Sequence, residues 1–285
     1  MDTPFNLLRH AIAALSDTLE LSQREARLEA QVLLCRTLQK PRSWLIAHER
    51  EALDAVQTSA YGVLLERRLA GEPIAYIVGE REFYGLSIKV TPDVLIPRPE
   101  TELLVELALA HLTENRVLRV LDLGTGSGAI AIAIAKYRPQ SSVTAVDISP
   151  GALATARENA QRHKLENVHF LSGVWFSAFS RQEKFDVIVS NPPYIAECAP
   201  HLAQGDLRFE PVGALAAGKD GLDDIRVIVA AAPSHLAPGG WLLFEHGYDQ
   251  AEACRELLRQ AGFAEIASNQ DLAGIERVAS GRLPA

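Results

Sequence analysis

Four consecutive residues of this 285-residue sequence, Asn191, Pro192, Pro193 and Tyr194, have the clearest chemical potential. The Asn191 carboxamide oxygen and the Pro192 carbonyl oxygen can each accept one N–H of an NH₂ group. Two such acceptors fix the plane of that group, so that its delocalised lone pair points in one direction. The prolines stiffen the backbone, and Tyr194 offers a flat face to a planar substrate. This pattern suits alkylation of an amide or aromatic amine nitrogen without a strong general base, and an ordinary Pro-Pro turn is the less favoured interpretation.

A second group of residues suits a nucleoside cofactor. Residues 121–128 read Leu-Asp-Leu-Gly-Thr-Gly-Ser-Gly, and the glycines let the backbone approach a ligand closely. The GxGxG spacing differs from the GxGxxG of dinucleotide sites. Asp147 stands at the end of the next predicted strand, where it can accept hydrogen bonds from both ribose hydroxyls or cap the following helix. Trp175 is equally compatible with stacking on adenine and with packing in the core.

An open, mostly parallel sheet must position these residues. Apolar segments predict strands over residues 117–123, 143–146, 168–171, 185–190, 241–245, 263–267 and 275–279. Helical patterns cover residues 99–111, 129–137, 151–163, 224–236 and 250–261. Ligands of such sheets bind at the carboxyl ends of the strands. We therefore predict an α/β fold in which the glycine loop, Asp147 and Asn191 meet at one edge.

The sequence before the sheet has a different texture. Residues 3–71 follow a helical pattern that includes a capping box formed by Ser22 and Glu25. Residues 82–97 contain short β-prone pieces interrupted by Gly85, Pro92 and Pro97. We predict a helical domain over residues 1–80, a β-hairpin linker over residues 81–97 and a catalytic domain over residues 98–285.

Composition restricts the class of function. The net charge of −8 disfavours unspecific nucleic-acid binding, and three scattered cysteines offer neither a disulfide framework nor a metal knuckle. No signal-peptide core and no membrane-length apolar run is present. We expect a cytoplasmic monomer with no metal, membrane or direct nucleic-acid partner. Glu245, His246 and Asp249 cluster after a predicted strand, and we interpret them as loop caps in preference to a base site.

Several motifs, taken in order, resemble the PrmC/HemK family of release factor glutamine methyltransferases. They are residues 71–79 (GEPIAYIVG), residues 95–102 (LIPRPETE), the loop 124–128, the tetrapeptide 191–194 and residues 209–211 (FEP). The tetrapeptide alone is shared with adenine-N6 DNA methyltransferases, so the specificity comes from the ordered set, which spans nearly the whole chain. The resemblance implies a Rossmann-like methyltransferase domain that ends in an antiparallel strand pair, with a helical N-terminal domain and a hairpin linker. It also implies S-adenosylmethionine as methyl donor and the glutamine of the Gly-Gly-Gln loop in class 1 peptide chain release factors as substrate.

The resemblance also implies roles for individual residues. The cofactor-binding residues would be Gly124, Thr125, Gly126, Ser127, Gly128, Asp147 at the ribose, Trp175 at the adenine, and Asn191. Asn191, Pro192 and Tyr194 would be catalytic, and together with Pro193 they would form the glutamine pocket. Val174 stands where the family often has an acidic residue, so a contact to the adenine amino group is in doubt.

Other functions remain open at this point. A glutamine of a ribosomal protein would require the same chemistry, as in a sister family with the same tetrapeptide. An adenine-N6 DNA methyltransferase should show a basic recognition region, whereas this chain offers only short pairs such as Arg67 and Arg68. A methyltransferase fold that merely binds a partner is disfavoured by the presence of Asp147 and Asn191.

Overall fold

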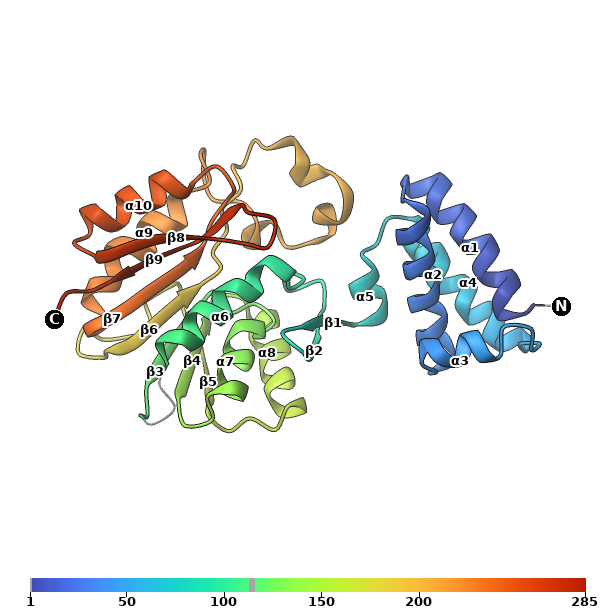
Figure 1. The fold of residues 1–285 in the computed structure, drawn as a ribbon, viewed down its shortest axis with the longest axis horizontal. Coiled ribbons are helices and arrows are strands. Elements are labelled where there is room, and N and C mark those ends of the chain that lie inside the picture. Colours follow the sequence, from blue (N-terminus) through green and yellow to red (C-terminus); the bar gives the residue numbers. More distant parts are fainter. Residues whose placement is uncertain (1, 113–115) are drawn as a thin grey trace. The chain divides into compact units, whose positions relative to one another are not determined.

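The computed structural model describes residues 2–112 and 116–285, and these form two compact units (Figure 1). One unit comprises residues 1–80 together with Gly205–Phe209, and the other comprises residues 81–204 and 210–285. Within the described ranges, no helix has both the length and the apolar character needed to cross a bilayer. The domain boundaries given above stay predictions.

The first unit is helical, as the sequence pattern predicts. It contains α1 (Pro4–Leu19), α2 (Gln23–Leu38), α3 (Arg42–Ala47), α4 (Ala55–Leu69), α5 (Ile74–Val78) and the 3₁₀ segment η3 (Gly205–Phe209). The predicted capping box is confirmed, because Ser22 Oγ accepts from Glu25 N at 3.3 Å and Glu25 Oε2 accepts from Ser22 N at 3.0 Å. Leu15, Leu33 and Tyr61 lie in its apolar core.

A buried arginine explains why η3 belongs to this unit although it is distant in sequence. Arg68 is 5% exposed, and its Nε lies 2.7 Å from Glu29 Oε2 on α2. Its Nη1 lies 3.3 Å from Asp206 Oδ1 on η3. A buried guanidinium requires such partners, since an unpaired charge in the interior is strongly destabilising.

The second unit contains a hairpin and a large sheet. The hairpin strands are β1 (Glu80–Phe83) and β2 (Leu86–Lys89). The sheet strands are β3 (Arg119–Leu123), β4 (Ser142–Asp147), β5 (Val168–Ser172), β6 (Phe185–Ser190), β7 (Leu236–Glu245), β8 (Ala264–Gln270) and β9 (Glu276–Arg282). Their order across the described part of the chain is β5-β4-β3-β6-β7-β9-β8. Strands β5 to β7 are parallel neighbours, and β9 is antiparallel to both β7 and β8. The predicted α/β sheet and its antiparallel end are confirmed.

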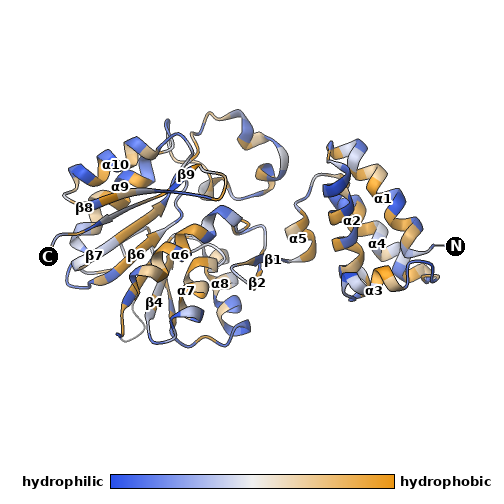
Figure 2. Ribbon diagram, in the orientation of Figure 1, coloured by the Kyte–Doolittle hydropathy of each residue, from blue (hydrophilic) through white to orange (hydrophobic). Residues whose placement is uncertain are grey.

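Helices cover both faces of this sheet. They are α6 (Glu102–His111) after the turn η1 (Pro99–Thr101), α7 (Ala129–Tyr137), α8 (Pro150–Arg162), α9 (Asp223–Ala231) and α10 (Ala251–Gln260), with short 3₁₀ turns η2 (Pro200–Ala203), η4 (Val212–Ala214) and η5 (Ala232–Ser234). Along β6, Val187 and Val189 pack with α6 and α7, whereas Ile188 packs with α9 and α10 on the opposite face (Figure 1). Strand β6 and helix α7 are accordingly rich in hydrophobic residues (Figure 2).

One predicted helix extends too far. The helical pattern over residues 224–236 ends at Ala231, and the chain then forms η5 and enters β7 at Leu236. Pro233 lacks the N–H that a continued helix needs, which accounts for the stop. Leu236 instead pairs with Phe185 on β6.

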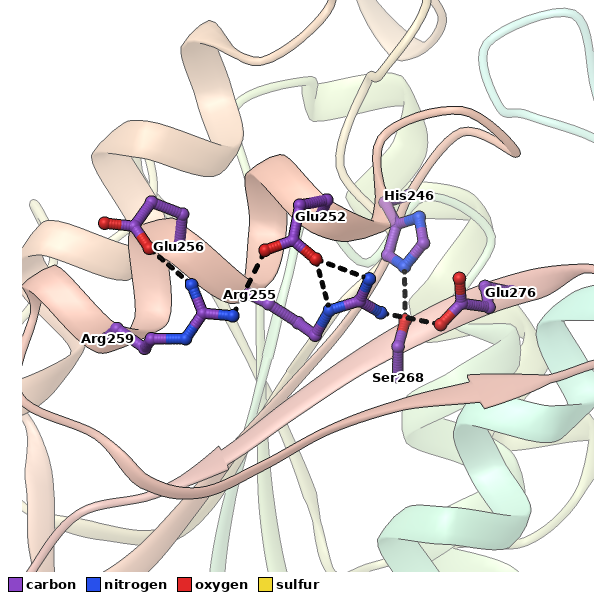
Figure 3. Close-up of polar contacts among 7 residues, drawn as sticks. All are labelled: His246, Glu252, Arg255, Glu256, Arg259, Ser268 and Glu276. Carbon is purple, nitrogen blue, oxygen red and sulfur yellow. Dashed lines mark hydrogen bonds and ion pairs between the residues drawn. The ribbon is translucent and has the colours of Figure 1, made fainter.

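Polar contacts tie α10 to the antiparallel end of the sheet (Figure 3). Arg255 lies 2.8 Å from Glu252 on the same helix and 2.6 Å from Glu276 on β9. His246, which follows β7, contacts Ser268 Oγ on β8 at 3.3 Å. Partly exposed ion pairs of this kind contribute little to stability, so the buried apolar faces supply most of it.

Candidate active site

The strand order reverses between β3 and β6, and this is where the predicted site lies. Leu123 at the end of β3 pairs with Ser190 at the end of β6, so the glycine loop and Asn191 leave the sheet side by side. A cavity of about 360 Å³ opens there. The predicted site residues that line it are Gly124, Thr125, Gly126, Ser127, Asp147, Trp175, Asn191 and Pro193. The other three, Gly128, Pro192 and Tyr194, are not among its lining residues.

The Asp147 carboxylate connects the end of β4 to the glycine loop. Its Oδ2 accepts from Gly126 N at 2.8 Å, and its Oδ1 accepts from Ser149 N at 2.9 Å. Capping of α8 falls to Ser149, whose hydroxyl oxygen accepts from Ala152 N at 3.2 Å. Each carboxylate oxygen keeps a further lone pair, so Asp147, which lines the cavity, is equipped to accept from hydroxyls there.

The glycine loop leaves room for a ligand. Gly126 has a φ of 55°, and a Cβ added to it would meet no atom within 4 Å. A Cβ on Gly124 would instead lie 3.2 Å from Cζ3 of Trp175, so the indole packs directly on this backbone.

Trp175 lies between the core and the cavity. It packs against the core on the α9 and α10 face, and it also lines the cavity. Its Nε1 donates to Asp224 Oδ1 at 3.2 Å, and Asp224 lines the cavity as well. Partial burial raises the pKa of Asp224. The sequence analysis missed Asp224, because this residue lies in the first turn of a helix and belongs to no cofactor motif. In the structure Asp224 supplies an acidic side chain to the part of the cavity wall where Val174 supplies none.

Asn191 lines the cavity, and its amide nitrogen is already hydrogen-bonded. Its Nδ2 donates to Thr101 Oγ1 at 3.2 Å. Among the described residues, neither the Asn191 Oδ1 nor the Pro192 carbonyl oxygen accepts a hydrogen bond. The Asn191 carboxamide oxygen is therefore free to accept from an incoming NH₂ group, whereas Pro192 is buried and is not among the cavity's lining residues.

The interpretation of Glu245, His246 and Asp249 as loop caps is wrong for Glu245. It is the last residue of β7 and 1% exposed. Its Oε2 accepts from Thr101 Oγ1 at 2.7 Å, and its Oε1 accepts from the Tyr194 hydroxyl at 3.0 Å. Burial raises the pKa of Glu245. The prediction was wrong because both partners are distant in sequence, and no local spacing reveals them.

Two of the sequence motifs meet beside the cavity. Glu210, from the motif over residues 209–211, is 4% exposed and accepts from Ile96 N at 3.1 Å. Its other oxygen pairs with the Arg98 guanidinium. This ion pair holds the segment from residue 95, which supplies Leu95 and Pro97 to the cavity wall, against the segment that supplies Pro211.

A second buried carboxyl lies beneath the glycine loop. Asp122 is fully buried in β3, and its Oδ2 accepts from Thr125 Oγ1 at 2.6 Å. Burial raises the pKa of Asp122 to about 7, and the nearby negative charge of Asp147 acts in the same direction.

Comparison with known proteins agrees with this architecture. Residues 114–274 match the family described as a methyltransferase domain. A methyltransferase from Pyrococcus furiosus has the same fold, with a TM-score of 0.54, 21% identity, and coverage of 77% of this chain and 98% of the other. A T. thermophilus 16S rRNA methyltransferase gives a TM-score of 0.53 and 21% identity, with coverage of 72% and 49%. Fold and site thus define a Rossmann-like methyltransferase.

The particular family follows from the rest of the chain. Residues 6–79 match the PrmC N-terminal domain. Release factor glutamine methyltransferases from Bordetella pertussis, Vibrio cholerae and Burkholderia pseudomallei are 54%, 50% and 51% identical to it. The alignments cover 90%, 95% and 98% of this chain and 95%, 95% and 99% of the relatives. The chain belongs to the family of release factor glutamine methyltransferases, which confirms the resemblance drawn from its motifs.

Proposed function

We propose that this chain transfers the methyl group of S-adenosylmethionine to the side-chain amide nitrogen of the glutamine in the Gly-Gly-Gln loop of a class 1 peptide chain release factor. Family membership supports the reaction and the partner. The observation that carries the proposal is the Asn191 carboxamide, which lines the cavity with its nitrogen held by Thr101, so that its oxygen would be left for a ligand.

The cavity fits the proposed methyl donor. Its volume of about 360 Å³ lies within the range of small-molecule sites. The open space above Gly126 admits a ligand against the backbone, Asp147 would hold the ribose hydroxyls and Trp175 would lie at the adenine. Bound S-adenosylmethionine would supply an electrophilic methyl group on a sulfonium centre.

Positioning would supply most of the catalysis. An amide nitrogen is a weak nucleophile, because its lone pair is delocalised into the carbonyl group. Asn191 Oδ1 and the Pro192 carbonyl oxygen would accept the two N–H bonds and aim that lone pair at the methyl carbon. The nitrogen would form a bond to this carbon while the carbon–sulfur bond broke with its electron pair going to sulfur, and the nitrogen would then lose one proton to water. Orientation of this kind lowers barriers by about 7 kcal/mol or more.

One methyl-transfer assay tests the proposal. The full chain is incubated with labelled S-adenosylmethionine and either a class 1 release factor or the same factor with its loop glutamine replaced by alanine. We expect label only on the first, with the added mass mapped to the glutamine side chain. Equal labelling of both factors would refute the proposal. Preferential labelling of ribosomal subunits or of unmodified DNA would point to the two alternative substrates.

We also propose that residues 1–80 dock the release factor, and that the chain works as a cytoplasmic monomer. The family assignment of residues 6–79 supports a role that is distinct from the chemistry. Analytical ultracentrifugation of the full chain with a release factor should show one copy of each in the complex. A complex containing two copies of this chain would contradict the monomer.

A further inference from the structure

Three hydrogen bonds in series connect the proposed amide-binding turn to the buried end of β7. Asn191 Nδ2 donates to Thr101 Oγ1 at 3.2 Å, and Thr101 Oγ1 donates to Glu245 Oε2 at 2.7 Å. The Tyr194 hydroxyl donates to Glu245 Oε1 at 3.0 Å. Thr101 and Glu245 are both buried, and the family motifs of the sequence analysis give Glu245 no role.

The direction of each hydrogen bond in this series is determined by the carboxylate. In the structure the hydroxyls of Thr101 and Tyr194 both donate to Glu245, and a carboxylate group in this position acts as an acceptor only. A threonine hydroxyl has one proton. When this proton is used in the hydrogen bond to Glu245, the oxygen can only accept further hydrogen bonds. Asn191 must therefore meet Thr101 with its NH₂ group.

The opposite orientation of Asn191 would remove the proposed acceptor. With the carboxamide rotated by half a turn, its NH₂ would face the NH₂ group of the substrate, and two donors cannot pair. Leaving buried donors unpaired is unfavourable, because their desolvation is not compensated. The two rotamers have almost the same shape, so packing alone discriminates weakly between them.

We propose that Glu245 and Thr101 are positioning residues that orient the Asn191 carboxamide so that its oxygen faces the substrate amide. This inference rests on the proposed function, because it takes an NH₂ group as the ligand of that oxygen. Tyr194 is the second anchor of Glu245, and it joins the stiff diproline turn to the same carboxylate. Gln250 Nε2 also stabilises this turn by donating to the Tyr194 carbonyl oxygen at 3.0 Å.

Variants of Thr101 test the orientation. Thr101→Val preserves the shape but removes the hydroxyl, and we expect kcat to fall about 10- to 100-fold while the Kd for S-adenosylmethionine changes less than about threefold. Thr101→Ser restores the hydroxyl and should return kcat to within about threefold of the wild type. The control is Thr155→Val, which removes another buried hydroxyl that donates to Gly151 O at 3.0 Å. The inference is overturned if Thr101→Val keeps the kcat of the wild type, or if the kcat of Thr101→Ser is as low as that of Thr101→Val.

Glu245→Gln tests the polarity of the series with a side chain of the same shape. The introduced NH₂ can donate to Thr101, whose proton is then free to donate to the Asn191 oxygen and turn it from the cavity. We expect kcat to fall at least about tenfold with the thermal unfolding temperature within a few degrees of the wild type. Unchanged kcat would contradict the role of the carboxylate.

A spectroscopic readout separates this inference from the proposed function. In ¹⁵N-labelled protein, the Asn191 side-chain NH₂ should show one proton shifted by its bond to Thr101, and Thr101→Val should abolish the shift. An unchanged NH₂ signal in that variant refutes the orientation even if the enzyme methylates release factors. Conversely, a wild type that labels no release factor refutes the proposed function, while the NMR result still decides the orientation.

Discussion

The two halves of the cavity are held by contacts of different range. In the cofactor half, Asp147 accepts from Gly126 and Ser149, which are 21 and 2 residues away in sequence. In the amide half, Asn191 and Glu245 meet at Thr101 over separations of 90 and 144 residues. The contacts of Asp147 are thus made by backbone donors within the stretch from β3 to α8, although Trp175 in the same half also donates to Asp224 over 49 residues. The amide half is organised by side chains from three distant segments. Replacing one side chain should therefore disturb more distant segments of the chain in the amide half than in the cofactor half.

Each half also contains a fully or almost fully buried carboxyl group. Asp122 lies under the glycine loop with one side-chain donor, Thr125, whereas Glu245 lies under the amide turn with two, Thr101 and Tyr194. Burial raises the pKa of both. At Glu245 the hydrogen bonds from Thr101 and Tyr194 act against this rise, and at Asp122 those from Thr125 and the Ala131 backbone do so.

Asn191→Ala should give the largest difference between the two halves, because it should lower turnover and leave cofactor binding measurable. It removes the oxygen proposed to orient the substrate amide, and we expect kcat to fall about 10²- to 10³-fold, as for other lost transition-state contacts. Binding of S-adenosylmethionine should stay measurable by calorimetry, because Asp147 and the glycine loop are untouched. The matched control is Asn269→Ala on β8, which removes a carboxamide that donates to Val278 O on β9. If both asparagine variants turned over like the wild type, Asn191 would have no catalytic role.

The buried carboxyl of the cofactor half should make stability depend on pH. Its pKa rises from 3.8 in an unfolded chain to about 7 in the fold, so the native state keeps a proton that the unfolded state has lost. The wild type therefore loses stability as pH increases from about 4 to 7, and Asp122→Asn does not share this loss. The free energy of unfolding should shift in favour of the variant by at most about 4 kcal/mol over this range.

Urea unfolding of both proteins at pH 4.5 and at pH 8 would measure this difference. Because the carboxamide introduced by Asp122→Asn cannot ionise but can still accept from Thr125, the comparison isolates the proton. A stability difference that is the same at both pH values would mean that Asp122 titrates normally.

The sequence predicts the cofactor half of the site because the relevant signals are local. Strand, glycine loop and helix follow one another, and Asp147 ends the next strand, so one segment of chain is enough to place them. Helix α7 has the predicted bounds, and the capping box at Ser22 needs only four neighbouring residues.

The amide half could be predicted only in part. The stiff turn at Asn191 is visible in the sequence, but its partners come from η1 and β7, and their residue types are ordinary. Glu245 at the end of a buried strand resembles many capping residues, and Asp224 resembles any acid in the first turn of a helix. Such contacts become evident only when the sheet order brings the segments together.

A change of Asp147 should affect affinity more than turnover. Asp147→Ala removes a carboxylate that accepts from two backbone N–H groups and is proposed to hold the ribose. We expect the Kd for S-adenosylmethionine to rise about 10- to 100-fold, since hydrogen bonds to charged groups are worth about 1.5–3 kcal/mol. At saturating donor, kcat should stay within about threefold of the wild type. A fall in kcat with unchanged Kd would show that the two halves are not separable in this way.

The smallest expected effect concerns the wall that carries Trp175. Asp224→Ala removes the acceptor of the indole N–H and the acid on this side of the cavity. We expect a rise of about 3- to 10-fold in the Kd for S-adenosylmethionine, in keeping with the loss of one hydrogen bond of about 0.5–1.5 kcal/mol. Val174 is half exposed on the same wall, so Val174→Asp in the Asp224→Ala background should recover part of the lost affinity.

Calorimetry on the two single variants and the double variant would establish whether the two positions serve the same ligand group. If the double variant recovers affinity for S-adenosylmethionine and Val174→Asp alone changes it little, one acid is sufficient on this wall. In the wild type Asp224 would supply that acid. Additive effects would show that Asp224 acts only by holding the Trp175 ring. In that case the cofactor half would also depend on a long-range side-chain contact, and the contrast between the two halves would be one of degree.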